Sequence, residues 1–510
     1  MTYRIVTTPL GAPAMPEPRD GGLAPELLPA FVAAPGAEAA LARLAEPGAL
    51  VVTTGQQPAL FTGPMYTVHK AVAAAALARV LERRWGRTVV PVFWSAGDDH
   101  DYAEASSTAW LDVEGRLRTG VLPPRDADAP LEPMYRLPLG PEVEELVTQF
   151  GADVAGAEYA GWTTEWLARH WRAGATMGAA GAGAVAELLA PLGIACFDPT
   201  HPSAKAASAP LLLTALAQSA ELDADLARRA AELAAARAPD PGIAVGDGAT
   251  LVMLEGRLGR DRLVRDGDGR FRTRRGAERF DLAELEAVAA REPSRLSANV
   301  LLRPLLESAL LPTVAYVAGP GELRYLQLPT PLYARLGVPR QLPVPRWSGL
   351  VLERRVERVL EKFGVPPDAA LSDLDGLERR VVRDHLPPDA VAGLAALRRA
   401  LEEGYERVRA GAGDVDPTLV RAVEGARRRA LYGVDSVERK LVRNLRHRLD
   451  VELAQVHRVR DALRPDGAPQ ERVLTEASFL ARHGPQLLER LGEAAQTWYE
   501  RALEGTPAYS

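Results

Sequence analysis

The chain has 510 residues, 47% hydrophobic and 25% charged, which allows two or three domains with a sizeable buried core. Its formal net charge of -6 argues against nucleic acid as the main partner, because phosphate backbones are bound by basic surfaces. There is no run of about 18 uncharged apolar residues and no long apolar stretch at the N-terminus, so we expect a cytoplasmic protein without a membrane span or signal peptide.

The first predicted elements form a βαβ unit. An apolar, β-rich run predicts a strand over residues 49–54, and an Ala- and Leu-rich pattern predicts a helix from Met65 to Trp85. A second buried strand is predicted over 88–94. Such a unit is parallel and right-handed, and it places ligands beyond the carboxyl ends of its strands.

The turn after the first strand carries groups that suit an anion. Backbone N–H groups, a helix N-terminus and two basic side chains meet there, which favours a phosphate or a carboxylate. Lysine is scarce, with four among 61 basic residues, so a lysine inside this motif points to a required ammonium group. The candidates are Gly55, Gln56, Gln57, Thr62, Gly63, Tyr66, His69 and Lys70. The alternative is that Thr62-Gly63-Pro64 only starts the helix and that His69 faces solvent.

An acidic cluster follows the second strand directly and is predicted to face Lys70 and His69 across a crevice. Three carboxylates and a histidine within four residues repel one another unless a cation, a basic neighbour or a ligand lies among them. They could bind a divalent metal, accept hydrogen bonds from a substrate or act as a general base. The alternative is a solvent-exposed helix cap. The candidates are Asp98, Asp99, His100, Asp101 and Glu104.

The middle of the chain alternates between helix and strand. The Ala-rich stretch 165–192 is predicted to be helical, and 194–197 is predicted to be a strand that buries Cys196, the single cysteine. Helices are predicted over 203–237, and short alternating runs split by Gly-Asp pairs predict hairpins over 249–273.

A third group of candidates surrounds a last core strand, predicted over 312–318. Two glycines after this strand would allow a ligand to approach the backbone closely, although the same sequence fits a plain strand-to-helix turn. The scarcity of asparagine singles out the preceding segment. The candidates are Asn299, Arg303, Gly319, Gly321, Glu322 and Tyr325.

The C-terminal third is predicted to be mostly helical. The Pro-rich segment 338–347 is interpreted as an extended linker, followed by a helical connector over 347–388. Apolar residues at steps of four and three then predict a coiled-coil arm over 389–463, in which a helix near 391–410 packs antiparallel. Two helices of an ordinary bundle are the alternative. A final helical segment, 464–510, is expected to pack on the core.

Two segments in combination, TGQQPALFTGPMYTVHK (54–70) and PVFWSAGDDHDYAE (91–104), closely resemble the bacillithiol-biosynthesis cysteine-adding enzymes, the BshC family of cysteine ligases. The resemblance continues through 297–326, PVPRWSG, VERK and RPDGAPQERVL, and so spans nearly the whole chain. The family more often has glutamate at the position of Asp98, and the region 200–295 looks divergent.

The resemblance implies an α/β fold with a Rossmann-like, parallel-sheet core similar to nucleotidyltransferases over 1–346, with connecting insertions at about 120–170 and 205–295. It also implies a C-terminal antiparallel coiled coil that forms a homodimer. The implied reaction is the addition of cysteine to the amine of glucosaminyl-malate, the final amide-forming step of bacillithiol synthesis. The implied partners are these two small molecules.

The predicted chemistry starts from the fact that amide formation in water is unfavourable, so the cysteine carboxyl must be activated as an acyl phosphate or an adenylate. ATP is the expected activator; no residue is assigned as a metal ligand, and the need for a metal stays open. On this hypothesis Lys70 and His69 stabilise phosphate or carboxylate charge, and Lys70→Ala is expected to lose turnover with little loss of fold. The cluster from Asp98 to Asp101 holds the sugar-malate and deprotonates its amine.

Two other functions fit the same residues. A metal-dependent nucleotidyltransferase or phosphohydrolase would use the acidic cluster as metal ligands. A nucleotide-binding coiled-coil scaffold would carry out no catalysis.

Overall fold

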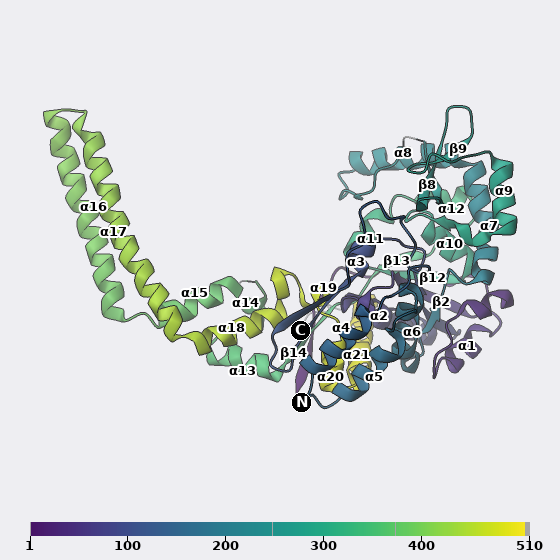
Figure 1. The fold of residues 1–510 in the computed structure, drawn as a ribbon, viewed down its shortest axis with the longest axis horizontal. Coiled ribbons are helices and arrows are strands. Elements are labelled where there is room, and N and C mark those ends of the chain that lie inside the picture. Colours follow the sequence, from purple (N-terminus) through teal and green to yellow (C-terminus); the bar gives the residue numbers. More distant parts are fainter. Residues whose placement is uncertain (1, 247, 373, 505–510) are drawn as a thin grey trace. The chain divides into compact units, whose positions relative to one another are not determined.

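The structure is a computed structural model that describes residues 2–246, 248–372 and 374–504 (Figure 1). The chain divides into two compact units. The larger comprises Tyr3–Val351 and Ala468–Ser510, and the smaller comprises Met1–Thr2 and Leu352–Gly467.

The core of the larger unit is a five-stranded sheet whose strands all pair in parallel, in the order β13-β12-β2-β3-β6. Its strands are β2 (Leu50–Gln56), β3 (Val89–Ser95), β6 (Ala195–Phe197), β12 (Thr313–Ala318) and β13 (Leu342–Pro345). The side chains of β2 are buried up to its last residue, as expected for a parallel sheet covered on both faces. The predicted α/β class with a Rossmann-like sheet is confirmed, as is the burial of Cys196.

The helix α2 (Tyr66–Trp85) connects β2 to β3 and packs against both strands. Its run of small alanines lets it lie close to the sheet, and most of its residues are buried. It ends where Gly86 adopts a left-handed conformation, which is the usual way for glycine to terminate a helix. The predicted βαβ unit is therefore confirmed.

The connection from β3 to β6 contains a hairpin and four helices. They are α3 (Tyr102–Ala105), β4 (Ser107–Leu111), β5 (Leu117–Val121), α4 (Glu142–Asp153), α5 (Ala160–His170) and α6 (Met177–Leu189). The prediction of one helical stretch over 165–192 was wrong. Gly174 turns the chain with a positive φ of 81°, and Thr176 caps the start of α6 with its side chain, so two helices form.

The connection from β6 to β12 carries a second, antiparallel sheet with the strand order β10-β9-β8-β7-β11. Its strands are β7 (Ala249–Gly256), β8 (Gly259–Arg265), β9 (Phe271–Thr273), β10 (Arg279–Phe280) and β11 (Leu296–Ala298). The accompanying helices are α7 (Pro202–Ala217), α8 (Ser219–Ala235), α9 (Leu282–Arg291) and α10 (Arg303–Leu310). The predicted hairpins over 249–273 are confirmed.

The Pro-rich segment 338–347 is not a linker, which corrects the prediction. Its residues Leu342–Pro345 form β13, which pairs in parallel with β12 at the edge of the central sheet. Proline is tolerated on an edge strand because its missing N–H takes no hydrogen bond away from an inner ladder. This strand brings Arg346 and Trp347 into the buried interior.

The strands β1 (Tyr3–Thr7) and β14 (Gly349–Glu353) form a two-stranded sheet. The smaller unit is helical apart from the last two residues of β14, Leu352 and Glu353. Figure 1 shows α16 and α17 lying side by side as a long helical hairpin. The helices of the smaller unit are α13 (Arg354–Lys362), α14 (Pro367–Ser372), α15 (Leu374–Asp384), α16 (Pro388–Val415), α17 (Leu419–Arg448) and α18 (Asp450–Leu463). The apolar seam expected to continue to residue 463 is interrupted after Arg448, because α18 packs on α13 and α15 instead.

The segment after residue 467 returns to the larger unit. It forms α19 (Gln470–Val473), α20 (Ala477–His483) and α21 (Gln486–Leu503), and α21 packs on α2. The backbone carbonyl of Leu474 accepts a hydrogen bond of 2.8 Å from the N–H of Met65, just before α2 begins. Within the described residues, no helix is long and apolar enough to cross a membrane.

Candidate active site

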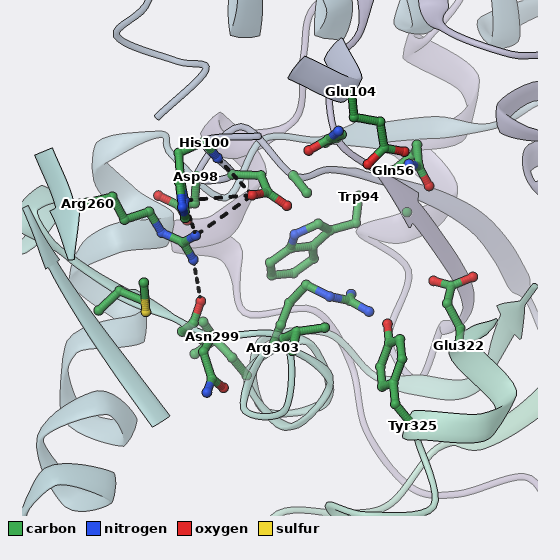
Figure 2. A pocket seen from close by; sticks show the side chains of 18 of the residues that line it. Gln56, Trp94, Asp98, His100, Glu104, Arg260, Asn299, Arg303, Glu322 and Tyr325 are labelled. Atoms are coloured by element: carbon green, nitrogen blue, oxygen red, sulfur yellow. Dashed lines mark hydrogen bonds and ion pairs between the residues drawn. The ribbon is translucent and has the colours of Figure 1, made fainter. Parts of the chain in front are cut away.

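A cavity of about 330 Å³ lies at the carboxyl ends of β2 and β3, where the antiparallel sheet approaches them (Figure 2). Predicted residues that line it are Gly55, Gln56, Gln57, Asp98, Asp99, His100, Glu104, Asn299, Arg303, Glu322 and Tyr325. Predicted residues outside the lining are Thr62, Gly63, Tyr66, His69, Lys70, Asp101, Gly319 and Gly321. The structure therefore brings residues from all three predicted groups of candidates to one cavity, but some candidates of each group lie outside its lining.

The glycine at the end of β2 is required by the neighbouring strand. A Cβ atom on Gly55 would lie 2.8 Å from the carbonyl oxygen of Trp94 on β3, which is too close for any other residue. Gly55 therefore keeps β2 and β3 in register, and the close approach of a ligand is not needed to explain it.

Lys70 lies behind the cavity wall, and its charge is already neutralised. The side chain is 3% exposed, its Nζ donates to the carbonyl oxygen of Gly55 at 2.6 Å, and it forms a 2.8 Å ion pair with Glu322. Burial lowers the pKa of Lys70, although Glu322 opposes this. Burial alone would raise the pKa of Glu322, but Lys70 overcomes it and holds that pKa below its usual value. The predicted role of Lys70 in stabilising phosphate or carboxylate charge of a ligand therefore has no support in this geometry.

The same glutamate occupies the N-terminus of α11 (Pro320–Tyr325). Glu322 accepts a 2.7 Å hydrogen bond from the N–H of Gly319 and a 2.5 Å hydrogen bond from the hydroxyl of Tyr316. A Cβ on Gly319 would lie 3.4 Å from this carboxylate, whereas one on Gly321 would meet nothing within 4 Å. The two glycines thus form a self-capped turn, and their predicted role in ligand approach has no support in this geometry.

Removing the Lys70 ammonium is expected to destabilise the fold. The Lys70→Met variant leaves Glu322 charged beside the buried end of β2, and breaking such a pair costs about 3–5 kcal/mol. This replaces the expectation that a Lys70 variant keeps its fold. Urea denaturation checks it, with the double variant Lys70→Met/Glu322→Gln as the control. The double variant should recover part of the loss, and equal stability of Lys70→Met and the parent protein would contradict the assignment.

His69 faces away from the cavity, which corrects the prediction that it faces the acidic cluster across the crevice. It is fully buried, its Nδ1 lies 2.8 Å from Glu471 in the C-terminal segment, and its ring packs edge-on against Trp347. Burial lowers the pKa of His69, although Glu471 opposes this. Because His69 and Lys70 are adjacent on α2, they point in different directions, and only Lys70 reaches the cavity wall.

Thr62 and Gly63 also turn toward the C-terminal segment. Both have a positive φ, 69° and 75°, and the hydroxyl of Thr62 donates to the carbonyl oxygen of Phe61 at 2.5 Å and contacts the carboxyl group of Glu476. Burial raises the pKa of Glu476 to about 7. A protonated Glu476 can donate to Thr62 while Thr62 donates to Phe61, so the neutral carboxyl satisfies this buried contact.

The raised pKa of Glu476 predicts how stability depends on pH. Below the ordinary carboxyl pKa of 4.5 the group is protonated in both the folded and unfolded states and changes nothing. As the pH rises from there through about 7, the unfolded chain releases its proton first, so stability falls, by on the order of 3 kcal/mol in total. Glu476→Gln should remove this loss. Urea denaturation at pH 5 and pH 8.5 measures it, and an equal pH dependence of variant and parent would contradict it.

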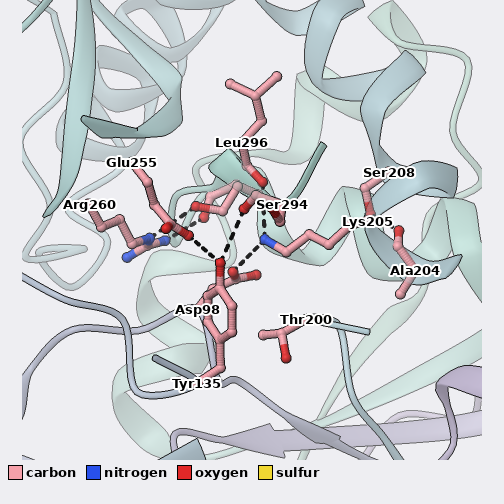
Figure 3. Close-up of polar contacts among 12 residues, drawn as sticks. Asp98, Tyr135, Thr200, Ala204, Lys205, Ser208, Glu255, Arg260, Ser294 and Leu296 are labelled. Atoms are coloured by element: carbon pink, nitrogen blue, oxygen red, sulfur yellow. Dashed lines mark hydrogen bonds and ion pairs between the residues drawn. The ribbon is translucent and has the colours of Figure 1, made fainter. Parts of the chain in front are cut away.

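Asp98 is held from behind by the second buried lysine (Figure 3). The Nζ of Lys205, on α7, lies 2.5 Å from Asp98 and donates to the carbonyl oxygen of Leu296 at 3.1 Å. Asp101 does not line the cavity, because its side chain caps α3 by accepting a 3.1 Å hydrogen bond from the N–H of Glu104. Both carboxylates therefore have structural partners, and neither is free to act as a base.

His100 also cannot serve as the base in this arrangement. Its Nδ1 accepts a 3.1 Å hydrogen bond from Nη1 of Arg260, so a neutral ring carries its proton on Nε2. Burial, followed by the positive charge of Arg260, lowers the pKa of His100 and favours this neutral form. The ring can then donate a hydrogen bond but has no free lone pair to accept a proton.

The carboxylates that remain available are Asp99 and Glu104. Asp99 accepts a 2.7 Å hydrogen bond from the backbone N–H of His100, and its side-chain contacts with basic groups are long, 3.8 Å to His100 and 3.9 Å to Arg260. Glu104 accepts a 3.3 Å hydrogen bond from the hydroxyl of Tyr66. Partial desolvation, then the negative charges of Asp101 and Asp99, raise the pKa of Glu104. A carboxylate with a raised pKa is a stronger base.

The opposite wall comes from α10 and the segment before it. Arg303 forms a 2.9 Å ion pair with the fully buried Glu307 and lies over the ring of Tyr316. The side-chain oxygen of Asn299 accepts from the N–H groups of Leu301 and Leu302 at 3.0 Å each, which fixes the start of the helix. Burial, then Glu322, raise the pKa of Tyr325 to about 12, so its hydroxyl stays protonated.

Sequence reasoning missed several residues of this site. The cavity is also lined by Arg260 and Arg262 from β8, by Trp94 and by Tyr316. Among the residues that the structure describes, no group of three or more His, Cys, Asp or Glu side chains is placed to hold a metal ion.

Comparisons with known proteins show which family the sequence of this chain matches. Residues 29–347 match the model of the bacillithiol biosynthesis BshC N-terminal Rossmann-like domain, and residues 349–499 match its C-terminal coiled-coil domain. A protein of Solibacter usitatus is 31% identical over 90% of this chain and 84% of its own length. Proteins of Koribacter versatilis, 31% identical over 92% and 86%, and Heliobacterium modesticaldum, 32% over 90% and 83%, are similar. All three carry the name "Putative cysteine ligase BshC".

Proposed function

The chain belongs to the bacillithiol biosynthesis BshC family, and on that premise we propose that it joins cysteine to the amine of glucosaminyl-malate, the final step in making bacillithiol. The observation that carries the proposal is that residues from both motif segments of the resemblance, 55–57 from the first and 98–100 with Glu104 from the second, line one cavity at the carboxyl edge of a parallel sheet. Open parallel sheets bind their ligands at this edge.

The reaction requires activation of the cysteine carboxyl group. We propose that ATP supplies the leaving group, and the charge distribution of the cavity supports this, because Arg260 and Arg262 can neutralise phosphate oxygens without a P-loop. The neutral His100 can donate a hydrogen bond from Nε2 to an oxygen that gains charge. These side chains hold and orient the activated carboxyl carbon for attack.

The attacking amine must lose its protons. Glu104 is the base that fits best, because its pKa is raised and its hydrogen bond to Tyr66 is weak enough, at 3.3 Å, to be exchanged for a substrate proton. Asp99 holds the ammonium form of the substrate beside it before the transfer. In this assignment the shorter side chain of Asp98 does not contact the amine, because Lys205 keeps it in the cavity wall.

We include a homodimer through the α16–α17 hairpin in this proposal. The outer surface of the hairpin leaves large apolar side chains exposed, which a second copy would cover. Those side chains are Val391, Leu397, Val408, Tyr432, Val437 and Leu441.

Incubation with cysteine, glucosaminyl-malate and ATP tests the function directly, with product mass and nucleotide followed together. The proposal requires an amide product that contains both substrates and consumption of one ATP for each amide. Hydrolysis or transfer of the nucleotide without any amide product would favour the nucleotidyltransferase or phosphohydrolase reading instead. A parallel reaction with a chelator shows whether a divalent metal is needed.

A further inference from the structure

Most basic side chains beside the cavity are neutralised by a close carboxylate. Three of them form ion pairs within hydrogen-bond distance, which leaves little net charge for a ligand. The pairs are Lys70–Glu322 at 2.8 Å, Lys205–Asp98 at 2.5 Å and Arg303–Glu307 at 2.9 Å.

Arg260 differs from these three because its partners are neutral. The side chain is 8% exposed, and its guanidinium donates to Ser297 at 3.0 Å, to the carbonyl oxygen of Ala298 at 2.8 Å and to His100 at 3.1 Å. The nearest carboxylate oxygen, on Asp99, is 3.9 Å away. Figure 2 shows Arg260 reaching the cavity beside His100. Hydrogen bonds to neutral groups fix the guanidinium in position without cancelling its charge.

Arg262 lies two residues further along β8 and therefore on the same face of the strand. Its side chain lines the cavity, and within the described part of the chain it forms no hydrogen bond or ion pair. Burial, then the positive charges of Arg274 and Arg260, lower the pKa of Arg262. Partly buried positive charges that repel one another are stabilised when an anion binds between them.

We infer that Arg260 and Arg262 form an anion subsite in the cavity, which takes a group with two or more negative charges. This inference deepens the proposed function and rests on it for the two sources of such a group. One is the malate dicarboxylate of the amine substrate, and the other is the polyphosphate of the activating nucleotide. Planar guanidinium groups recognise both by paired N–H donors.

The subsite also explains why Arg260 and Arg262 lie next to the acidic side of the cavity. Asp99, which suits an amine, lies 3.9 Å from Arg260, and Glu104 and Arg262 line the same cavity, so the cavity fits a ligand that carries both charges. It further gives a function to β8, which lies in the region 200–295 that looks divergent in the sequence.

Binding of two unreactive probes, malate and tripolyphosphate, tests the subsite by calorimetry without turnover. The parent protein, Arg262→Ala and Arg262→Lys are compared with Arg279→Ala as the matched control, because Arg279 lies on β10 at the far edge of the same sheet and is 66% exposed. Arg262→Ala should weaken binding of the bound probe about tenfold or more, and Arg262→Lys less, whereas Arg279→Ala should change nothing. The probe that responds identifies the source of the anion.

Failure of both probes to bind the parent protein, or equal affinities of the bound probe for Arg262→Ala and Arg279→Ala, would overturn the subsite. Because the side chain of Arg262 has no hydrogen-bond or ion-pair partner among the described residues, its variants should keep the melting temperature of the parent. The amide-forming assay separates the two proposals. Weaker probe binding by Arg262→Ala, without any amide product from the parent protein, supports the subsite and contradicts the proposed function. An amide product, with probe binding unchanged in Arg262→Ala, supports the proposed function and contradicts the subsite.

Discussion

Replacing Glu471 by glutamine is expected to reduce the free energy of unfolding by about 3–5 kcal/mol, because it leaves a buried arginine without its counter-charge. Glu471 binds the guanidinium of Arg346 through both oxygens, at 2.6 and 2.7 Å, and also contacts His69 and Ser348 at 2.8 Å each. Arg346 is 2% exposed. The four residues come from three distant parts of the chain, so their contacts tie the C-terminal segment to α2 and to the end of β13.

The size of this loss is judged against a surface ion pair in the same segment. Glu500 on α21 pairs with Arg83, and both side chains are exposed, so Glu500→Gln should cost about 1 kcal/mol or less. Urea denaturation of both variants at neutral pH provides the comparison. A similar loss for the two variants would show that the Glu471 cluster does not stabilise the fold in this way.

The same cluster also predicts a response to acid. Burial would raise the pKa of Glu471, but His69 and Arg346 overcome it and hold that pKa well below the ordinary value of 4.5. The stabilisation is therefore complete above pH 4.5 and is lost as the pH falls toward the lower, folded-state pKa. Glu471→Gln should lack this acid-dependent part of the stability curve.

The second large effect is expected on catalysis. Glu104→Gln should lower turnover by about 10²- to 10⁴-fold, the usual contribution of a general base. The fold should remain intact, because the side chain of Glu104 is exposed at the cavity and its one long hydrogen bond, to Tyr66, is also available to glutamine. Asp99→Asn should mainly raise the KM for the amine substrate, since Asp99 is assigned to holding the ammonium group.

The pH profile distinguishes a base from a residue that only shapes the cavity. In the parent protein the rate should fall as the pH drops below the raised pKa of Glu104, and this limb should be absent in Glu104→Gln. Glu114→Gln, on the hairpin between β4 and β5 and outside the cavity, is the matched control. A full rate for Glu104→Gln, or an unchanged acidic limb, would remove Glu104 from the mechanism.

The strands and the position of the cavity could be predicted because they follow from local patterns. The runs that became β2, β3 and β12 are short, apolar and bounded by glycine or polar residues, and ligands of parallel sheets bind at one edge. The Pro-rich segment was misread because a proline in an edge strand looks the same in sequence as a proline in a linker. The difference lies in its pairing with β12, which is a long-range contact.

The roles of His69 and Lys70 could not be predicted, because their partners are far away in the sequence. Glu322 and Glu471 lie hundreds of residues after α2, and only the fold shows that they neutralise these side chains. Lys205 could have been singled out from the sequence, because it is, like Lys70, one of only four lysines in the chain. Arg260 and Arg262 could not, because arginine is the ordinary basic residue of this chain, with 61 basic residues of which only four are lysine.

The central claim is that this cavity joins an activated cysteine carboxyl group to an amine. Cysteine labelled with ¹⁸O in both carboxyl oxygens tests it most directly, by mass spectrometry of all products after reaction with glucosaminyl-malate and ATP. The account predicts one ¹⁸O in the amide product and the other in the phosphate or AMP released, because the leaving group departs with one carboxyl oxygen. Absence of the amide, or an amide formed while phosphate and AMP carry no ¹⁸O, would contradict it.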